Sequence, residues 1–461
     1  LRTMQDLIDC LKQTVNDPSV LETQDISDKY HADWSGASPC APIALLKPKT
    51  PQQLSQIMTL CHQFEQPVVV QGGLTGLSGG ATPQRGEMAI SLERMTGIEE
   101  IDGTEMTLTA LAGTPLQLLQ DAALEKNLFL PLDLASRGSC TIGGNLATNA
   151  GGTEVIRYGM ARSMVLGLEA VLADGSLISS MNKMVKNNSG YDLKQLFIGT
   201  EGTLGIISRV VIQLQPKALR SHTALCALKS YQDVMALLVA LKHSLGSGLT
   251  GFELMWDNYF DKVLQTIPSL QSPFNQSHPF YLLVEYKDSD KISAADYFES
   301  VLFSELEAGI VQDAVIAQSH QDAAKFWQIR DGISEILPIL GPISNQDISL
   351  PTTEIETFTL HMQQTLEKKY NNLNILMFGH LGDNNLHVCA YTGREDDKAS
   401  IDNDIMQMIG QFGGAITAEH GVGVTKKEFL PLSRSANEIA LMKTIESELD
   451  PKGILNPGRI F

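Results

Sequence analysis

The alternation of apolar and polar positions divides the chain into two regions that each mix strands with helices. In the first region, from residue 43 to residue 216, short apolar runs alternate with segments of helical periodicity. Pro51 opens a helix that we expect to run to Phe64, and a buried strand follows at 68–70. We expect further strands at 43–46, 88–92, 106–112, 164–172 and 206–214, and a helix near 115–126.

The second region repeats this rhythm with longer elements. We expect strands at 222–228, 249–255, 280–286, 374–380 and 387–391, helices at 292–306, 320–337 and 354–369, and a last helix at 435–449. The pattern predicts an α+β protein. We place a partly helical acidic leader at 1–37, a first domain at 38–217, a second domain at 218–425 and a C-terminal helical segment at 426–461.

Composition narrows the functional classes. The chain carries 34 Lys and Arg against 53 Asp and Glu, a net charge of −19, which disfavours a nucleic-acid partner. The longest apolar runs, such as 234–241, are far shorter than the ~18–20 residues of a membrane span. The six cysteines include no C-x-x-C pair, so we expect reduced thiols and a cytoplasmic protein. Because the chain begins at Leu1, the removal of a leader stays open.

Three glycine-rich segments in the first region, 71–80, 138–152 and 199–205, indicate ligand binding. Glycine lets the backbone approach a ligand closely, so that successive N–H groups can converge on an anion such as a pyrophosphate. None of the segments matches G-x-G-x-x-G, and the chain contains no G-x-x-x-x-G-K-[ST]. The usual dinucleotide fold and the P-loop are therefore both disfavoured.

A pair of histidines in the second region suggests a metal site. Asp383-Asn384 between two apolar runs predicts a two-residue hairpin turn, which would set His380 opposite His387 on one face. Glu419 could complete a site with open coordination positions. The spacing alone leaves a metal site and two ordinary buried histidines equally open.

The glycine segments, with Pro131-Leu132-Asp133 ahead of the second, resemble the FAD domain of the vanillyl-alcohol-oxidase and p-cresol-methylhydroxylase superfamily. The ending 449–458, LDPKGILNPG, resembles the C-terminal signature of its D-2-hydroxy-acid dehydrogenase branch, which holds D-lactate, glycolate and D-2-hydroxyglutarate dehydrogenases. The resemblance spans residues 40–461. It implies a PCMH-type FAD-binding domain, an α/β cap domain with an antiparallel sheet, and a C-terminal segment that returns to the FAD domain.

The resemblance also implies a set of FAD-binding residues. These are Gly72, Gly73, Leu74, Thr75, Gly76, Leu77 and Ser78 in the first segment, Asp133, Gly138, Ser139, Thr141, Gly143, Gly144, Asn145, Ala147 and Thr148 in the second, and Glu201, Gly202, Ile206, Ile207 and Asn456 beyond it. Asn456 would reach the isoalloxazine, and Glu201 the adenosine side. The first segment has no His or Cys and the second has only Cys140, so we expect non-covalent FAD.

In this branch, His380, His387 and Glu419 fall on metal-ligand positions, and His420 falls on the general base. We expect a divalent metal, with Zn²⁺ as the first choice. Arg330 and Ser334 fall in the substrate-binding segment. Two substrate positions depart from the pattern of relatives that take D-2-hydroxyglutarate. These positions are Asn345, where those relatives carry Lys, and Cys389, where those relatives carry Asn.

The resemblance thus implies flavin-dependent oxidation of a D-2-hydroxy acid, of the D-2-hydroxyglutarate or D-lactate type, to the 2-oxo acid. Hydride would pass to N5 of FAD, a metal would assist substrate binding, and His420 would act as base. An electron-transferring flavoprotein or a quinone would accept the electrons, although an oxidase using O₂ stays open. The alternatives are a zinc-dependent hydrolase and a catalytically weakened flavin-binding homologue. A homodimer is one oligomeric state that the sequence leaves open.

Overall fold

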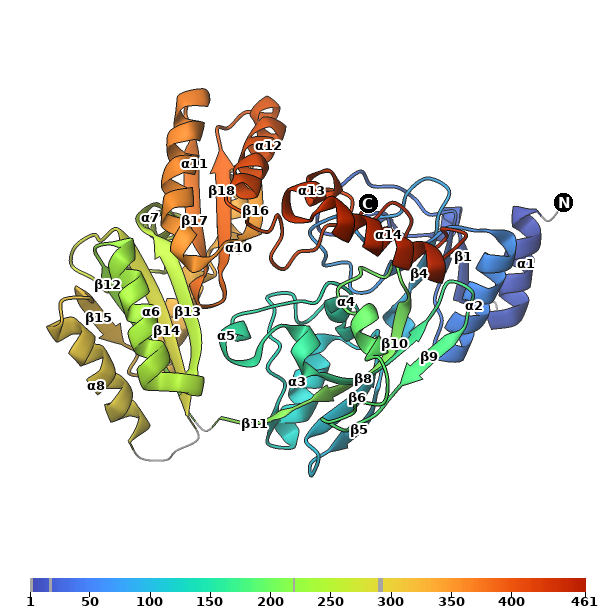
Figure 1. Cartoon of the computed structure of the whole chain (residues 1–461), viewed down its shortest axis with the longest axis horizontal. Helices are drawn as coiled ribbons and strands as arrows, with labels where there is room; N and C mark the ends of the chain where they lie inside the picture. Colours follow the sequence, from blue (N-terminus) through green and yellow to red (C-terminus); the bar gives the residue numbers. More distant parts are fainter. Residues whose placement is uncertain (1–2, 16–18, 219, 289–292) are drawn as a thin grey trace. The chain divides into compact units, whose positions relative to one another are not determined.

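The computed structural model describes residues 3–15, 19–218, 220–288 and 293–461. The chain forms two compact units (Figure 1): the first consists of residues 1–152, 158–217 and 419–461, and the second of 153–157 and 218–418. The second unit ends at Ala418, and residues 419–425, which were predicted to lie in the second domain, are counted with the first unit. The predicted leader belongs to the first unit, and its residues 1–2 and 16–18 lie outside the described part.

The helices of the first unit are α1 (Met4–Val15), α2 (Pro51–Phe64), α3 (Leu116–Glu125), α4 (Ile142–Ala147), α13 (Leu430–Ser433) and α14 (Ala436–Leu449). Helix α5 (Val155–Tyr158) is divided, because only its last residue, Tyr158, is counted with the first unit. Its strands are β1 (Val20–Glu22), β2 (Ala44–Leu46), β3 (Val68–Gln71), β4 (Met88–Ser91), β5 (Ile98–Asp102), β6 (Thr107–Leu111), β7 (Leu128–Phe129), β8 (Val165–Val171), β9 (Leu177–Ser180), β10 (Ile206–Gln213) and β11 (Gln215–Pro216).

The helices of the second unit are α6 (Tyr231–Leu245), α7 (Asp257–Thr266), α8 (Ala294–Glu307), α9 (His320–Arg330), α10 (Ile333–Ile336), α11 (Ile355–Lys369) and α12 (Glu395–Gln411). Its strands are β12 (Arg220–Leu228), β13 (Leu249–Trp256), β14 (Phe280–Asp288), β15 (Asp313–Ile316), β16 (Ser344–Ser349), β17 (Asn374–His380) and β18 (Asn385–Tyr391).

Helix α2 shows how local signals fix an element of the first unit. The Thr50 hydroxyl accepts the N–H of Gln53 at 3.2 Å, and Pro51 follows as the first helical residue. Buried side chains such as Leu54 and Met58 face the core, and Glu65 ends the helix in the left-handed region at φ 54°. The helix predicted at 51–64 is confirmed.

The described strands of the first unit form two larger sheets and the two-stranded pair β11–β7. One larger sheet has the strand order β1-β2-β4-β3, with parallel β2–β4 and β3–β4 pairs, and the other is antiparallel with the order β5-β6-β10-β8-β9. The C-terminal segment returns to the first sheet, because Val68 donates its N–H to the carbonyl of Ile454 at 2.7 Å and accepts that of Asn456 at 2.9 Å. Strand β3, which ends at the first glycine segment, is thus fixed by the chain's end.

A seven-stranded antiparallel sheet, in the order β15-β12-β14-β13-β17-β18-β16, forms the second unit. The predicted two-residue hairpin is wrong in register: Phe378, not His380, pairs with His387. A 3-10 turn at Leu381–Asp383 and Asn384 at φ 74° lengthen the connection. Because the register shifts by two residues, both histidines keep the same face, as diagonal neighbours.

The helix predicted at 320–337 is also interrupted. Helix α9 ends at Arg330, and α10 begins at Ile333. Gly332 packs so tightly in the gap that a Cβ there would lie 2.7 Å from Cγ1 of Val263. The break turns the chain directly after Arg330. The helix predicted from Ile292 begins at Ala294, and Ile292 itself lies outside the described residues.

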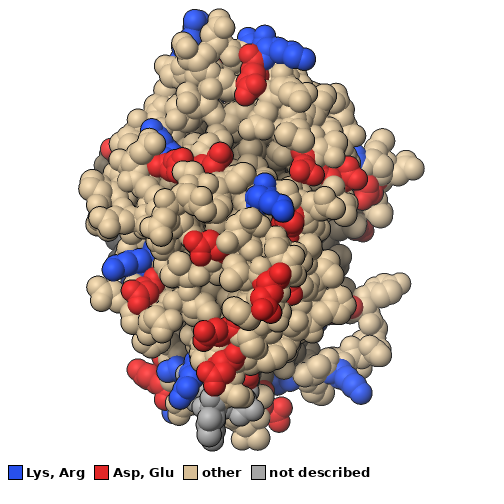
Figure 2. Space-filling view, turned by 90° about the vertical axis from the view of Figure 1, so that its left-hand side faces the viewer, with Lys and Arg blue, Asp and Glu red and all other residues tan. Residues whose placement is uncertain are grey.

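The surface agrees with the acidic composition. On the face drawn in Figure 2, acidic side chains lie between basic ones that stand apart from one another. In the described part of the chain, we find no helix with the length and apolar character needed to cross a membrane.

Candidate functional site

The first unit contains a pocket of about 350 Å³, which all three glycine segments line. The predicted cofactor residues line it, apart from Asp133, Gly138 and Ser139. Gly138 and Ser139 are exposed in a turn, and Asp133 forms an ion pair with Arg137 at 3.1 Å. The pocket is lined on this side by residues 134–136 and then by Cys140 and Thr141.

The first segment presents a row of unused backbone donors. Its carbonyls accept hydrogen bonds from its surroundings: Leu74 from the N–H of Trp34 at 3.1 Å, and Gly76 from the N–H of Ser35 at 3.0 Å. Among the described residues, in contrast, no acceptor takes the N–H groups of residues 72–78. Such a row in a glycine-rich loop is the arrangement that binds a pyrophosphate.

The second segment closes the pocket against the first. A Cβ on Gly73 would lie 2.0 Å from the Ser139 carbonyl oxygen, so only glycine allows this approach. Thr141 caps α4, its hydroxyl accepting the N–H of Gly144 at 3.4 Å. The buried Oδ1 of Asn145, also in the lining, has no hydrogen-bond partner among the described residues. A ligand with N–H or O–H donors, as FAD has, would satisfy it.

Residues of the leader, which sequence reasoning did not assign, also line the pocket. Asp33 is buried and accepts the N–H of Ser35 at 3.0 Å, while Trp34 lies in the lining with 62% of its surface exposed. No pattern in the leader's sequence reveals that the N–H groups of Trp34 and Ser35 donate to the first glycine segment.

Asn456 joins the C-terminal segment to two parts of the pocket. Its Oδ1 accepts the N–H of Val70 at 2.8 Å, and its Nδ2 donates to the carbonyl of Glu201 at 2.7 Å. Glu201 and Asn456 both line the pocket, and both have positive φ angles, of 52° and 46°. The side chain that the resemblance assigns to the isoalloxazine thus already bridges the first sheet and the third glycine segment.

The loop after Ala418 brings Glu419 and His420 into the lining of the same pocket. Glu419 accepts the N–H of Gly152 at 3.2 Å through Oε1, and the carbonyl of His420 accepts the hydroxyl of Ser78 at 3.0 Å. Both side chains are half-buried. The predicted general base therefore lines the pocket whose donors suit a flavin.

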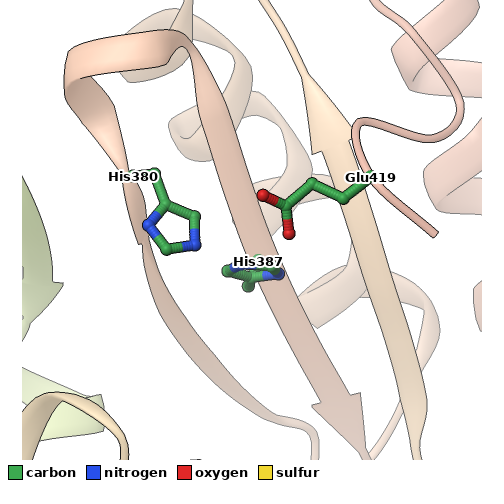
Figure 3. A group of neighbouring side chains, drawn as sticks. All are labelled: His380, His387 and Glu419. Carbon is green, nitrogen blue, oxygen red and sulfur yellow. The ribbon is translucent and has the colours of Figure 1, made fainter. Parts of the chain in front are cut away.

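His380, His387 and Glu419 offer ligand atoms that all lie within 4.8 Å of one another, and Figure 3 shows the Glu419 carboxylate pointing toward both rings. The histidines come from β17 and β18, and Glu419 is the residue directly after Ala418, whose N–H donates to the carbonyl of Asp347 at 3.2 Å. Two imidazoles and one carboxylate with open positions suit a catalytic divalent metal.

Each histidine of this group has a buried carboxylate at Nδ1. Oε1 of Glu253 lies 2.8 Å from Nδ1 of His380, and Oδ1 of Asp347 lies 3.8 Å from Nδ1 of His387. Both carboxylates are essentially inaccessible, with side-chain exposures of 1% and 0%. The contact of Glu253 is a hydrogen bond that fixes the His380 ring, whereas the 3.8 Å separation of Asp347 from His387 is too long to be one. Two imidazoles and one carboxylate form a donor set that fits the implied ion.

Glu253 also holds Arg330, and sequence reasoning missed it. Its Oε2 accepts from Nε of Arg330 at 2.7 Å, and Nη2 of that arginine lies 3.1 Å from Nε2 of His380. Burial raises the pKa of Glu253, but the charges of His380 and Arg330 outweigh burial and lower it. A single acidic residue inside the apolar strand β13 was the signal that marks it.

The other predicted substrate residues lie apart from this network. Ser334 is exposed on α10 and donates its hydroxyl to the carbonyl of Asp331 at 3.2 Å. Cys389 is buried, its Sγ lies 3.3 Å from Oδ1 of the exposed Asn345, and burial raises the pKa of its thiol to about 12. Cys389 follows His387 by two residues on the same face of β18.

Comparison with known proteins shows the family to which this chain belongs. The chain matches the C-terminal domain of FAD-linked oxidases over residues 218–460 and the FAD binding domain over 42–180. It is 38% identical to the mitochondrial D-2-hydroxyglutarate dehydrogenase of Arabidopsis thaliana, covering 98% of this chain and 80% of that protein. It is also 38% identical to the D-2-hydroxyglutarate dehydrogenase of Xanthomonas citri, covering 94% and 92%.

Among solved structures, p-cresol methylhydroxylase superposes with a TM-score of 0.79 over 99% of this chain and 96% of that one, at 16% identity. A likeness at this identity concerns the fold alone. Together with the FAD-domain match, it confirms the α+β class and the PCMH-type FAD fold that the resemblance implied.

Proposed function

We propose that this chain, which belongs to the family of FAD-linked oxidases and is an FAD-dependent oxidoreductase, oxidises a D-2-hydroxy acid to the 2-oxo acid. The observation that carries the proposal is the row of unused N–H groups at residues 72–78 in a pocket that also includes His420. The D-2-hydroxyglutarate dehydrogenases among its relatives support this substrate class.

For the flavin, we propose non-covalent binding. The N–H groups of residues 72–78 would hold the pyrophosphate, and Asn145 would accept a hydrogen bond from the cofactor. Bound FAD supplies the hydride acceptor at N5 of its ring. The chain's own part is to orient the substrate against that acceptor and to remove the hydroxyl proton.

For the metal, we propose that His380, His387 and Glu419 hold a divalent ion, with Zn²⁺ as the expected one. A bound ion would supply a Lewis acid that lowers the pKa of the substrate hydroxyl. The two buried carboxylates, Glu253 and Asp347, would keep the imidazoles oriented, as outer partners of metal ligands do.

His420 is the proposed base. As the C2–H bond breaks and its electron pair leaves as hydride, His420 accepts the hydroxyl proton and the C2–O bond becomes a carbonyl. Glu419 and His420 are adjacent in the loop after Ala418, and their ligand atoms lie within 4.8 Å of each other. The base would therefore act directly beside the metal ligand.

Arg330 is the proposed partner of a substrate carboxylate. Nε is bonded to Glu253, and Nη2 lies beside His380. Burial lowers the pKa of Arg330, but the Glu253 charge outweighs burial and raises it, so the guanidinium stays charged. Asn345 and Cys389 provide no charge for a second carboxylate. For electron transfer, we propose an electron-transferring flavoprotein or a quinone as acceptor.

The experiment that tests the mechanism separates the base from the metal ligand. We expect His420→Asn to retain FAD and metal but to reduce its flavin about 10²–10⁴-fold more slowly, because the proton acceptor is gone. We expect Glu419→Gln to bind metal more weakly, so that added Zn²⁺ restores part of its rate.

Rapid-mixing kinetics of flavin reduction provide the measurement, with metal content as the control. Histidine accepts a proton only when uncharged, so the wild-type rate should rise with pH and the asparagine variant should lose this rise. A His420→Asn enzyme with the wild-type rate and pH profile would refute the assignment of the base.

A further inference from the structure

The loop that carries Glu419 and His420 is held in place by contacts with other parts of the first unit. Residues 419–425 are neither helix nor strand, and Gly421 and Gly423 have φ angles of 82° and 54°. Such a loop keeps a fixed geometry mainly through contacts with its surroundings. In the first unit, each of the three glycine segments of the pocket contributes such a contact.

The third segment makes the strongest of these contacts. Oε1 of Glu201 accepts the N–H of Val422 at 2.6 Å, and Oε2 accepts the N–H of Gly423 at 2.8 Å. The residue is only 9% exposed. Through its two oxygens, one side chain therefore fixes two consecutive peptide groups of the loop.

The other two segments hold the ends of the loop. Ser78 of the first segment donates its hydroxyl to the carbonyl of His420 at 3.0 Å and accepts the N–H of Val424 at 2.9 Å. Gly152 of the second segment donates to the Glu419 carboxylate at 3.2 Å. The metal ligand, the base and the residues after them are thus all tied to the flavin pocket.

The contacts are too close to be rearranged freely. A Cβ on Gly421 would lie 2.8 Å from Oε1 of Glu201, and a Cβ on Gly423 would lie 2.1 Å from the Ser78 carbonyl oxygen. Both glycines also have left-handed φ angles that other residues rarely adopt. The loop therefore packs against the pocket wall with its backbone.

We infer that Glu201 is a positioning residue for the loop that carries Glu419 and His420, rather than a contact of the flavin. Both of its carboxylate oxygens already accept backbone N–H groups of that loop. The inference deepens the proposed function and rests on it, because it gives Glu419 and His420 their proposed roles. If Glu201 has this role, metal binding depends on a well-ordered third glycine segment.

The test uses the FAD-loaded holoenzyme and the variant Glu201→Gln. Glutamine has the same shape, but only its oxygen can accept, so one of the two N–H groups loses its partner. We expect full flavin content, faster hydrogen exchange at Val422 and Gly423, and Zn²⁺ affinity lower by about tenfold or more. A chromophoric chelator in competition measures the affinity.

The matched control is Glu169→Gln. Glu169 is a buried acid of the same unit that accepts from Ser208 at 2.8 Å and does not line the pocket. We expect wild-type exchange in the loop and wild-type Zn²⁺ affinity. Gly421→Ala provides a second variant that disturbs the same contact from the loop's side, should Glu201→Gln not fold.

The outcomes are distinct. Unchanged exchange at Val422 and Gly423 overturns the inference, and so does loss of flavin from Glu201→Gln, because the carboxylate would then be a flavin contact. Unchanged Zn²⁺ affinity in a variant with faster exchange overturns it as well. A wild-type holoenzyme that binds no Zn²⁺ refutes instead the proposed metal site, and hydrogen exchange alone then decides whether Glu201 positions the loop.

Discussion

Single buried carboxylates contact both groups of candidate functional residues in this protein. Glu253 orients the metal-ligand candidate His380 and the substrate candidate Arg330 with one oxygen each, and Glu201 holds two N–H groups of the loop behind His420. Sequence reasoning found the side chains that resemble known functional residues. It did not assign Glu253, because a lone acid in an apolar strand has no motif, and it gave Glu201 to the adenosine side of FAD.

The ion pair of Glu253 makes a prediction about stability. Removal of one partner leaves a buried charge uncompensated, which costs about 3–5 kcal/mol. We expect Glu253→Gln to lower the free energy of unfolding by this amount in denaturant titrations. Further substitution of Arg330 by Met should recover part of the loss, because the orphaned charge is then removed.

Glu99→Gln is the control, because Glu99 forms a more exposed pair with Arg209, its side chain being 35% exposed. Such a pair contributes less than about 1 kcal/mol. Equal effects of Glu253→Gln and Glu99→Gln would mean that the buried pair contributes no more than a surface one.

Trp34 provides a spectroscopic prediction for the pocket. It lines the pocket, whereas the two other tryptophans, Trp256 and Trp327, belong to the second unit. Flavins absorb the light that tryptophan emits, so we expect release of FAD to increase the emission of the wild type. The increase should be smaller in Trp34→Phe but retained in Trp256→Phe. An unchanged increase in Trp34→Phe would place the flavin away from the leader.

At the scale of elements, periodicity predicted what local signals determine. The bounds of α2 and β17 agree with the expected 51–64 and 374–380, since a capping Thr and Pro mark the first and an unbroken apolar run the second. The β17–β18 connection was mispredicted because Asn384 accepts a left-handed conformation after a 3-10 turn. The shared face of the histidines survived, because a two-residue shift preserves strand parity.

Strands β5, β9 and β16 were not predicted, for a different reason. The first two carry polar or partly exposed residues, and β16 reads Ser-Asn-Gln-Asp-Ile-Ser, with a buried Asp347 at its centre. Strand β16 pairs with β18, which follows only after α11 and β17, whereas β5 and β9 form hairpins with the adjacent strands β6 and β8. In both cases the pairing partner determines the strand, and the propensities of the strand's own residues do not reveal it.

The docking of the leader makes a prediction about pH. Glu93 accepts from Tyr30 at 2.7 Å and from Lys29 at 3.1 Å, and pairs with Lys47 at 2.8 Å. Burial raises the pKa of Glu93, but these hydrogen bonds outweigh it and lower the pKa from 4.5 to about 2. The stabilisation is therefore present above the ordinary value and is lost as the pH falls toward about 2.

The variant Glu93→Gln should show this directly. We expect its deficit in free energy of unfolding to be constant above about pH 5 and to shrink as the pH falls below 4.5. Denaturant titrations at a series of pH values measure it. A deficit independent of pH would show that the interaction of Glu93 with the leader is not ionic.

At the scale of the whole molecule, each unit contains contributions from distant parts of the chain. The first unit is completed by residues 419–461, whose Leu455 bridges to Val68 in parallel. The resemblance implied this return, but composition and periodicity alone did not, because nothing local indicates which strand a C-terminal segment will join. The same holds for Trp34 and the pocket.

The substrate's side chain is the property that the family leaves most open. Relatives of this chain are named D-2-hydroxyglutarate dehydrogenases, whereas Asn345 and Cys389 offer a neutral amide and a buried thiol. We expect Asn345→Lys to lower KM for a D-2-hydroxy dicarboxylate, because a cation is added, with little effect on a monocarboxylate. Steady-state kinetics on such a pair measure this. An equal effect on both substrates would show that residue 345 does not interact with the substrate's side chain.

Anaerobic reduction of the bound flavin by D- and L-2-hydroxy acids is the most direct test of the proposed function. The purified protein is mixed with each acid in the absence of oxygen, and the flavin absorption band is followed. We expect at least one D-2-hydroxy acid to bleach the band at a rate that falls about 10²–10⁴-fold in His420→Asn, while its L-enantiomer leaves the band unchanged. A flavin that no D-2-hydroxy acid reduces, or that the L-enantiomers reduce faster, would contradict the proposed function.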